Sequence, residues 1–171
     1  MIGVLFVGAR NTARSCLAEA IFQCMVAEAG LSDLIWVDSA GLSRWHIGAT
    51  AQREIRAILA AYDLPDERHA RLFQSADLDQ FDYILTMDRF ILSTLWNVIT
   101  SAEDWLPNVI VYGGREIVIR PLLHYAYAEG FVEGVEVPTP TYPEDFEPVY
   151  QLIRLGCLTL LDTIRREREL V

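Results

Sequence analysis

The 171-residue chain is 52% apolar and 22% charged, which is typical of a globular protein and excludes an intrinsically disordered one. Its formal net charge of −10 disfavours sequence-independent binding to nucleic acid or to an anionic membrane surface. No apolar run approaches the ~20 residues that a membrane span needs, and we expect residues 1–171 to form one domain.

The chain contains three cysteines, Cys16, Cys24 and Cys157, and none belongs to a Cys-x-x-Cys pair. An odd number of unpaired thiols indicates a reducing compartment. No basic segment precedes the apolar N-terminal stretch, so the sequence predicts no signal peptide, and we expect a cytoplasmic location. The three histidines are too scattered to suggest a zinc site, and we expect neither a metal nor a cofactor.

Strands and helices alternate along the chain. The segment 2–8, IGVLFVG, is a continuous apolar run of the kind found in a central parallel strand. In the helix predicted over 15–30, Leu17, Ile21 and Met25 share one face, and Gly30 marks the C-terminal end. The other predicted elements are strands at 34–41, 81–88 and 108–113 and helices at 50–64, 89–99 and 145–169.

This alternation predicts an α/β fold with an open, mainly parallel, four-stranded sheet and helices on both faces. The region 112–142 does not fit the alternation, because short apolar runs are mixed there with glycine and proline. A strand pair, a short helix and an extended flap remain open for this region.

The loop after the first strand, residues 8–14, has the features of an oxyanion site. Ligands of doubly wound sheets bind at the carboxyl ends of strands, and the helix that begins near Ser15 directs free N–H groups at this loop. Asn11 tolerates the left-handed backbone that such a cradle requires, and the guanidinium of Arg14 can hold two oxygens of one anion. The alternative is a plain turn with an arginine that faces solvent.

This loop resembles the phosphate loop of low-molecular-weight protein tyrosine phosphatases and their arsenate-reductase relatives. That family carries Cys-x5-Arg-Ser after its first strand, and this chain has Gly8, five residues, Arg14 and Ser15. Matching blocks follow in the family's order: LAEAIF, VDSAGLSRWHIG, HARLF, FDYILTMD and VPTPTYPEDFEPVYQLI. The resemblance covers most of the chain, stops at about 112–134, and implies the three-layer sandwich of these phosphatases.

The resemblance implies a role for each matching position. Ser39, His69 and Asp88 would support the loop, and two aromatic residues, Trp45 and Tyr142, would form the walls of a cleft. Each of three positions also has an alternative role on the residues alone: plain packing for Trp45, a satisfied buried polar group for His69, and helix capping for Asp88. The phosphate-binding residues would be Ala9, Arg10, Asn11, Thr12, Ala13, Arg14 and Ser15.

Two departures from the family pattern fall on its catalytic groups. The family mechanism needs a thiolate nucleophile, and that position is Gly8, which has no side chain. The mechanism also needs an acid, which the family supplies as an aspartate in a Val-Pro-Asp-Pro-Tyr-Tyr stretch. This chain has Thr139 at the acid position and Thr141 in place of the first tyrosine. Both catalytic positions are therefore vacant.

Nearby residues do not replace the missing groups. Cys16 lies two residues beyond Arg14, inside the helix, and is expected to be a small buried apolar residue. Glu144 and Asp145 lie close to the lost acid, but their protonation matters little without a nucleophile. Three roles remain open for Arg10: it adds positive charge to the loop, reaches a carboxylate of a partner, or pairs with a nearby acid and closes the pocket.

These features predict a catalytically inactive phosphatase-like protein, a pseudophosphatase, that keeps the oxyanion loop and binds a phosphorylated group or a protein partner. Two other functions remain open: a weakly active or altered hydrolase of the tyrosine phosphatase type, and a structural interaction protein with an empty loop. The aromatic-rich stretch 112–134 is a candidate surface for a partner or for self-association, and its alternative is an extra strand pair or cleft wall.

Overall fold

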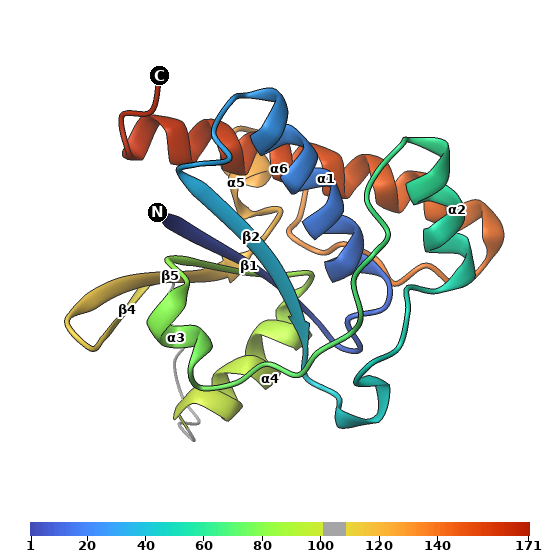
Figure 1. Cartoon of the computed structure of the whole chain (residues 1–171), viewed down its shortest axis with the longest axis horizontal. Helices are drawn as coiled ribbons and strands as arrows, with labels where there is room; N and C mark the ends of the chain where they lie inside the picture. Colours follow the sequence, from blue (N-terminus) through green and yellow to red (C-terminus); the bar gives the residue numbers. More distant parts are fainter. Residues whose placement is uncertain (101–108) are drawn as a thin grey trace.

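A computed structural model of the chain describes residues 1–100 and 109–171 (Figure 1). The strands are β1 (Ile2–Gly8), β2 (Ile35–Gly41), β3 (Tyr83–Thr86), β4 (Val109–Tyr112) and β5 (Arg115–Pro121). The helices are α1 (Arg14–Glu28), α2 (Arg53–Ala61), α3 (Asp77–Gln80), α4 (Arg89–Thr100), α5 (His124–Ala128) and α6 (Phe146–Glu167), with short 3-10 helices η1 (Arg44–His46) and η2 (Pro143–Asp145).

The sheet has the strand order β2-β1-β3-β5-β4. The pairs β1–β2, β1–β3 and β3–β5 are parallel, and β4 pairs with β5 antiparallel at one edge. Gly113 and Gly114 connect β4 to β5 with φ angles of 57° and 81°, a backbone that suits a tight hairpin and favours glycine. The prediction of an α/β fold with a mainly parallel sheet is confirmed.

The described residues form a sheet of five strands, whereas the sequence predicted four. The predicted strand 108–113 contains β4, but β4 is an antiparallel edge strand, and residue 108 lies outside the described residues. The fourth parallel strand is β5, which lies in the region left open between a strand pair, a helix and a flap. That region therefore contributes one strand of the hairpin and the short helix α5.

The core is built around β1, which lies between β2 and β3. Its residues Val4, Leu5, Phe6 and Val7 are fully buried, because helices cover both faces of the sheet. Figure 1 shows α1, α2, α5 and α6 on one side of the sheet and α3 and α4 on the other. Among the described residues, no helix has the length and apolar character of a membrane span.

The same topology places two connecting loops next to each other. Val7 of β1 is paired with Thr86 of β3, so the chain leaves both strands at the same edge of the sheet. The loop after β1 leads into α1, and the turn at Asp88 leads into α4. Both loops therefore meet at the carboxyl end of the central strands, where α/β sheets bind their ligands.

Candidate functional site

The loop between β1 and α1 directs its carbonyl groups away from its centre. The carbonyl of Ala9 accepts a hydrogen bond from the N–H of Leu42 at 3.0 Å, and that of Thr12 accepts one from the N–H of Gln52 at 2.8 Å. Within the described residues, no hydrogen bond has a backbone N–H of residues 10–13 as its donor. A loop with bonded carbonyls and free N–H groups is the backbone arrangement that cradles an anion.

Arg14 is held at the base of this loop by one of its nitrogens. Nη1 donates to Oδ2 of Asp88 at 2.8 Å and to the carbonyl of Val137 at 2.6 Å. The other carboxylate oxygen of Asp88 accepts the N–H of Ile91 at 2.8 Å, so Asp88 caps α4 and also fixes Arg14. Nε and Nη2 of Arg14 donate to none of the described residues, which leaves both available to the oxygens of one anion.

Asn11 gives the loop its shape. It is 2% exposed and has a φ angle of 60°, in the left-handed region that asparagine tolerates. Its Nδ2 donates to Oγ of Ser15 at 3.0 Å and to Oγ of Ser39 at 2.8 Å. Its Oδ1 accepts Nη2 of Arg68 at 2.8 Å and the backbone N–H of Arg71 at 3.1 Å. Four hydrogen bonds therefore stabilise the left-handed turn.

A buried carboxylate lies behind this network. Oε2 of Glu19 accepts the hydroxyl of Ser39 at 2.5 Å and forms an ion pair with Arg68. Burial raises the pKa of the Glu19 carboxyl, although the positive charge of Arg68 opposes the shift. The expected loop support by His69 differs from the structure, because the His69 side chain is exposed and its neighbour Arg68 makes the contacts.

Sequence analysis did not identify Arg68 or Glu19 as parts of the site. A signal existed in the segment LAEAIF, where Glu19 is the one polar residue of an otherwise apolar segment. A buried carboxylate needs a cation or several hydrogen-bond donors, so Glu19 itself predicted a partner from elsewhere in the chain.

The loop forms the floor of a cavity with a volume of about 380 Å³. Gly8 and Thr139, which occupy the two vacant catalytic positions, both line this cavity. The two aromatic residues expected to form the cleft walls, Trp45 and Tyr142, do not line this cavity. Their side chains are 92% and 63% exposed. The other lining residues are Ala9, Arg10, Asn11, Thr12, Ala13, Arg14, Ser15, Gln52, Asp88, Phe90, Ile91 and Pro140.

Neither Cys16 nor Asp145 supplies the missing chemistry. The Cys16 thiol donates to the carbonyl of Ala13 at 3.1 Å, and burial raises its pKa to about 12. Oδ2 of Asp145 accepts the N–H groups of Thr141 and Tyr142 at 3.0 and 2.9 Å, and these bonds lower its pKa. Asp145 does not line the cavity, so it is a turn-stabilising carboxylate.

The fold and the site together define an α/β protein with an anion cradle between its first strand and first helix. The sequence profile of the family described as low molecular weight phosphotyrosine protein phosphatase matches residues 3–170. The low molecular weight protein-tyrosine-phosphatase YfkJ of Bacillus subtilis is 37% identical over 171 residues, which cover 99% of this chain and 100% of YfkJ. The chain belongs to the low molecular weight phosphotyrosine protein phosphatase family.

Solved structures agree with this assignment. The crystal structure of YfkJ from Bacillus subtilis has a TM-score of 0.82 and 36% identity, covering 98% of this chain and 96% of that one. The Drosophila arginine phosphatase DARP has a TM-score of 0.80 and 28% identity, with 95% and 97% covered. Because the family profile continues through 112–134, the expectation that the resemblance stops there is wrong.

Proposed function

We propose that this protein is a catalytically inactive member of its family that binds a phosphorylated group in the loop after β1. The observation that carries the proposal is the set of residues that line one cavity. Arg14 and the free N–H groups of the loop lie in the same cavity as Gly8 and Thr139. The anion-binding parts are therefore present at the place where the nucleophile and the acid are missing.

The absence of a nucleophile also affects binding. A thiolate at position 8 would place a negative charge beside the bound anion, and two like charges at close range repel each other strongly. Gly8 removes that repulsion, while Arg14 keeps two donors for the anion. The net effect supports a site that retains its ligand instead of transforming it.

The ligand class follows from the relatives. YfkJ is named a protein-tyrosine-phosphatase, and DARP is named an arginine phosphatase. The first name implies a phosphorylated tyrosine of a protein and the second a phosphorylated arginine, and a cavity of about 380 Å³ suits one such side chain. A phosphorylated protein is therefore the ligand that we propose.

Titration calorimetry with inorganic phosphate and orthovanadate tests the loop, and hydrolysis of an aryl phosphate between about pH 5 and pH 7 tests catalysis. We expect binding of both anions and no hydrolysis above background. Exchange of Arg14 for methionine in an Asp88→Asn background should abolish binding, because that pair removes the guanidinium without leaving Asp88 as an unpaired carboxylate. Asparagine keeps an oxygen for the N–H of Ile91.

Two results would contradict the proposal. Hydrolysis that survives purification and disappears in the Arg14→Met, Asp88→Asn variant would identify an active or altered hydrolase. Failure of the folded wild-type protein to bind either anion would leave a structural interaction protein with an unused loop.

A further inference from the structure

The basic side chains of this protein differ in whether they form ion pairs. All fourteen are arginines, and the chain has no lysine. Half of the arginines pair with carboxylates of the described residues: Arg14, Arg56, Arg68, Arg71, Arg89, Arg115 and Arg166. An exposed arginine without such a partner leaves a local positive charge on a protein whose net charge is −10.

Three such arginines, Arg10, Arg44 and Arg53, belong to segments that touch the loop after β1. Arg10 is part of the loop and lines the cavity. Arg44 follows Ser43, whose backbone N–H donates to the carbonyl of Ala9 at 3.0 Å. The third, Arg53, follows Gln52, which lines the cavity and is hydrogen-bonded to the loop. We call Arg10, Arg44 and Arg53 the arginine rim.

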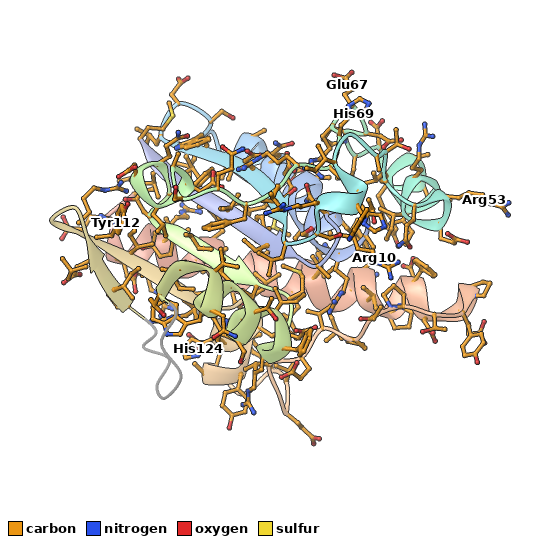
Figure 2. The ribbon with its side chains drawn as sticks, turned by 90° about the horizontal axis from the view of Figure 1, so that it is seen from below. Arg10, Arg53, Glu67, His69, Tyr112 and His124 are labelled. Carbon is orange, nitrogen blue, oxygen red and sulfur yellow. The ribbon has the colours of Figure 1, made fainter. Side chains whose placement is uncertain are left out.

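All three rim side chains are exposed, and none forms an ion pair with a carboxylate of the described residues. Arg10 therefore does not close the pocket by pairing with an acid of the described residues. Figure 2 shows Arg53 projecting from α2 away from the body of the molecule, with Arg10 at the same end of the view. Within the rim, Arg10 lines the cavity, whereas Arg44 and Arg53 lie on the two segments that are hydrogen-bonded to the loop. Arg53 also lines a separate hollow that contains Asp66, although the two form no ion pair.

Resting on the proposed function, we propose that the arginine rim selects a phosphorylated protein segment whose neighbouring residues are acidic. The loop holds the phosphate, and the rim holds carboxylates on either side of it. Guanidinium groups bind carboxylates through paired N–H donors, which favours this partner chemistry. The net charge of −10 opposes an extended polyanion such as nucleic acid, because only the area around the cavity attracts it.

Three synthetic peptides of equal length test this inference by titration: a phosphotyrosine peptide flanked by glutamates, the same peptide flanked by glutamines, and the glutamate peptide without phosphate. At low salt, we expect the glutamate phosphopeptide to bind roughly five- to tenfold more tightly than the glutamine phosphopeptide, because exposed ion pairs contribute modestly each. The difference should shrink at about 0.3 M salt, where exposed charges are screened. The unphosphorylated peptide should bind weakly.

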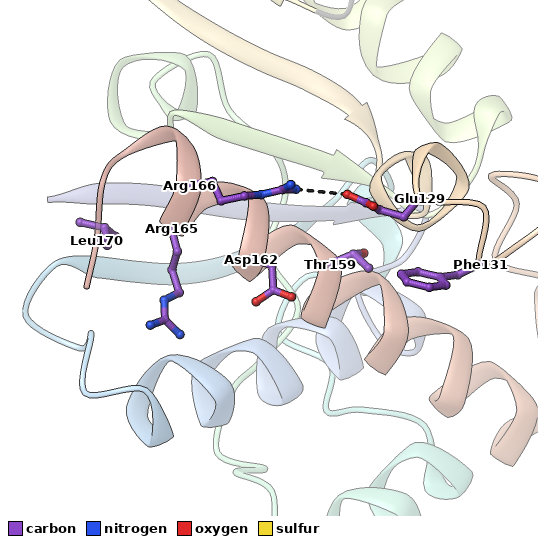
Figure 3. A pocket seen from close by; sticks show the side chains of 7 residues that line it. All are labelled: Glu129, Phe131, Thr159, Asp162, Arg165, Arg166 and Leu170. Carbon is purple, nitrogen blue, oxygen red and sulfur yellow. Dashed lines mark hydrogen bonds and ion pairs between the residues drawn. The ribbon is translucent and has the colours of Figure 1, made fainter.

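The variant Arg44→Gln, Arg53→Gln should remove most of this preference and leave the affinity for inorganic phosphate unchanged. A matched control is Arg165→Gln, Arg166→Gln, which removes the same charge from the last turns of α6. Figure 3 shows these two arginines at a different cavity, where Arg166 forms an exposed ion pair with Glu129 and a hydrogen bond to Thr163. The control should keep the preference for the acidic phosphopeptide.

The possible failures are distinguishable. If inorganic phosphate binds but the two phosphopeptides bind equally, the rim has no selective role, while the proposed function stands. If neither phosphate nor any peptide binds, both proposals are wrong. If a single-stranded oligonucleotide of similar charge binds as tightly as the glutamate phosphopeptide, the rim is a general anion surface and the inference is wrong.

Discussion

The side-chain oxygen of Ser15 lies 2.7 Å from the place that a Cβ atom on Gly8 would take, and the Cβ of Ser15 lies 3.0 Å from it. Ser15 is 1% exposed, and its Oγ accepts a hydrogen bond from Asn11 at 3.0 Å. Ser15 therefore fills the space beside the vacant nucleophile position. In this packing, a side chain at position 8 requires Ser15 to move.

Exchange of Gly8 for alanine should lower the free energy of unfolding by roughly 1–3 kcal/mol, because the buried Ser15 must rotate and strain or lose its bond to Asn11. Urea unfolding measures the change. A matched control is Gly134→Ala, since a Cβ there meets no atom within 4 Å. We expect the control to change stability by less than about 0.5 kcal/mol.

A double-mutant cycle with Ser15→Ala tests whether Ser15 causes the loss of stability in Gly8→Ala. This second substitution removes the atom nearest to the added Cβ. The two substitutions should be coupled by at least ~0.5 kcal/mol, with the double variant more stable than the sum of the single effects predicts. Additive effects would show that Ser15 does not cause the loss.

The vacant positions can be refilled. Gly8→Cys together with Thr139→Asp should yield measurable hydrolysis of an aryl phosphate, since both positions line the cavity that contains Arg14. The cysteine fits only after Ser15 rotates away from it, so this variant should also be less stable than the wild type. Adding the aspartate to the cysteine variant should raise the rate by roughly a hundredfold or more, the usual contribution of a general acid. Each single variant should do less, because nucleophile and acid act together.

A control for this experiment is Gly8→Cys with Thr141→Asp, which introduces the same charge two residues away at a position that does not line the cavity. It should behave like Gly8→Cys alone. If the Gly8→Cys, Thr139→Asp protein folds, binds phosphate and still does not hydrolyse the ester, the cavity differs from that of an active enzyme at further positions.

The buried Glu19 should make stability depend on pH. Its pKa is raised by burial, so the folded protein holds this proton more tightly than the unfolded chain, whose glutamates titrate near pH ~4.3. The contribution of Glu19 is therefore fully present below pH ~4.3 and is lost as the pH rises through the folded-state value. Urea unfolding at a series of pH values should show a decline that Glu19→Gln removes.

Asp145 provides a control of opposite sign. Its pKa is lowered by the N–H groups of Tyr142 and Thr141, so its contribution is present above the unfolded value and is lost as the pH falls. The difference between wild type and Asp145→Asn should therefore grow with rising pH. If Glu19→Gln leaves the pH dependence of stability unchanged, Glu19 has an ordinary pKa in the folded protein.

Most elements of the fold could be predicted from local patterns in the sequence. The apolar run of β1 and the end of α1 before Gly30 are short-range features that need no knowledge of the rest of the chain. The predicted apolar face of α1 is only partly correct, because residues 14–22 and Val26 are buried, whereas Met25 is only partly buried. In contrast, β5 was left undecided between a strand pair, a helix and a flap, because Glu116 and Arg120 interrupt its apolar residues and its position depends on long-range pairing with β3. A single sequence does not specify which distant strand fills that place.

The candidate site, like the fold, was predicted from the sequence only in its local part. Arg14, Asn11 and Ser15 were identified because the loop carries them within a few residues of one another. Arg68 was missed, because its contact with Asn11 spans 57 residues and the neighbouring His69 matched the family block. Contacts between distant segments, like the packing of Ser15 at Gly8, follow from the folded chain.

The stretch 112–134 divides between core and surface. Tyr125 is 5% exposed, and Arg120 lies over its ring at 5.4 Å from the ring centroid. Tyr127, two residues further along α5, is 52% exposed. The expectation that this stretch lies partly on the surface therefore applies to Tyr127, whereas Tyr125 belongs to the core.

These two tyrosines test stability and self-association separately. Tyr125→Ser should lower the free energy of unfolding by roughly 3 kcal/mol or more, as for other large-to-small core changes, without a specific effect on association. Tyr127→Ser should change stability by less than about 0.5 kcal/mol. If 112–134 mediates self-association, Tyr127→Ser should weaken it in sedimentation experiments at an unchanged melting temperature.

Tyr125→Phe serves as the matched control for the core. The Tyr125 hydroxyl is buried and makes no hydrogen bond of good geometry among the described residues, although the guanidinium of Arg120 lies close to the ring and interacts with it. Its removal should therefore change the free energy of unfolding by much less than Tyr125→Ser does. A loss on the scale of Tyr125→Ser would mean that this hydroxyl has a partner. If Tyr127→Ser leaves association unchanged at every protein concentration, Tyr127 is not part of a self-association surface and that role for 112–134 should be abandoned.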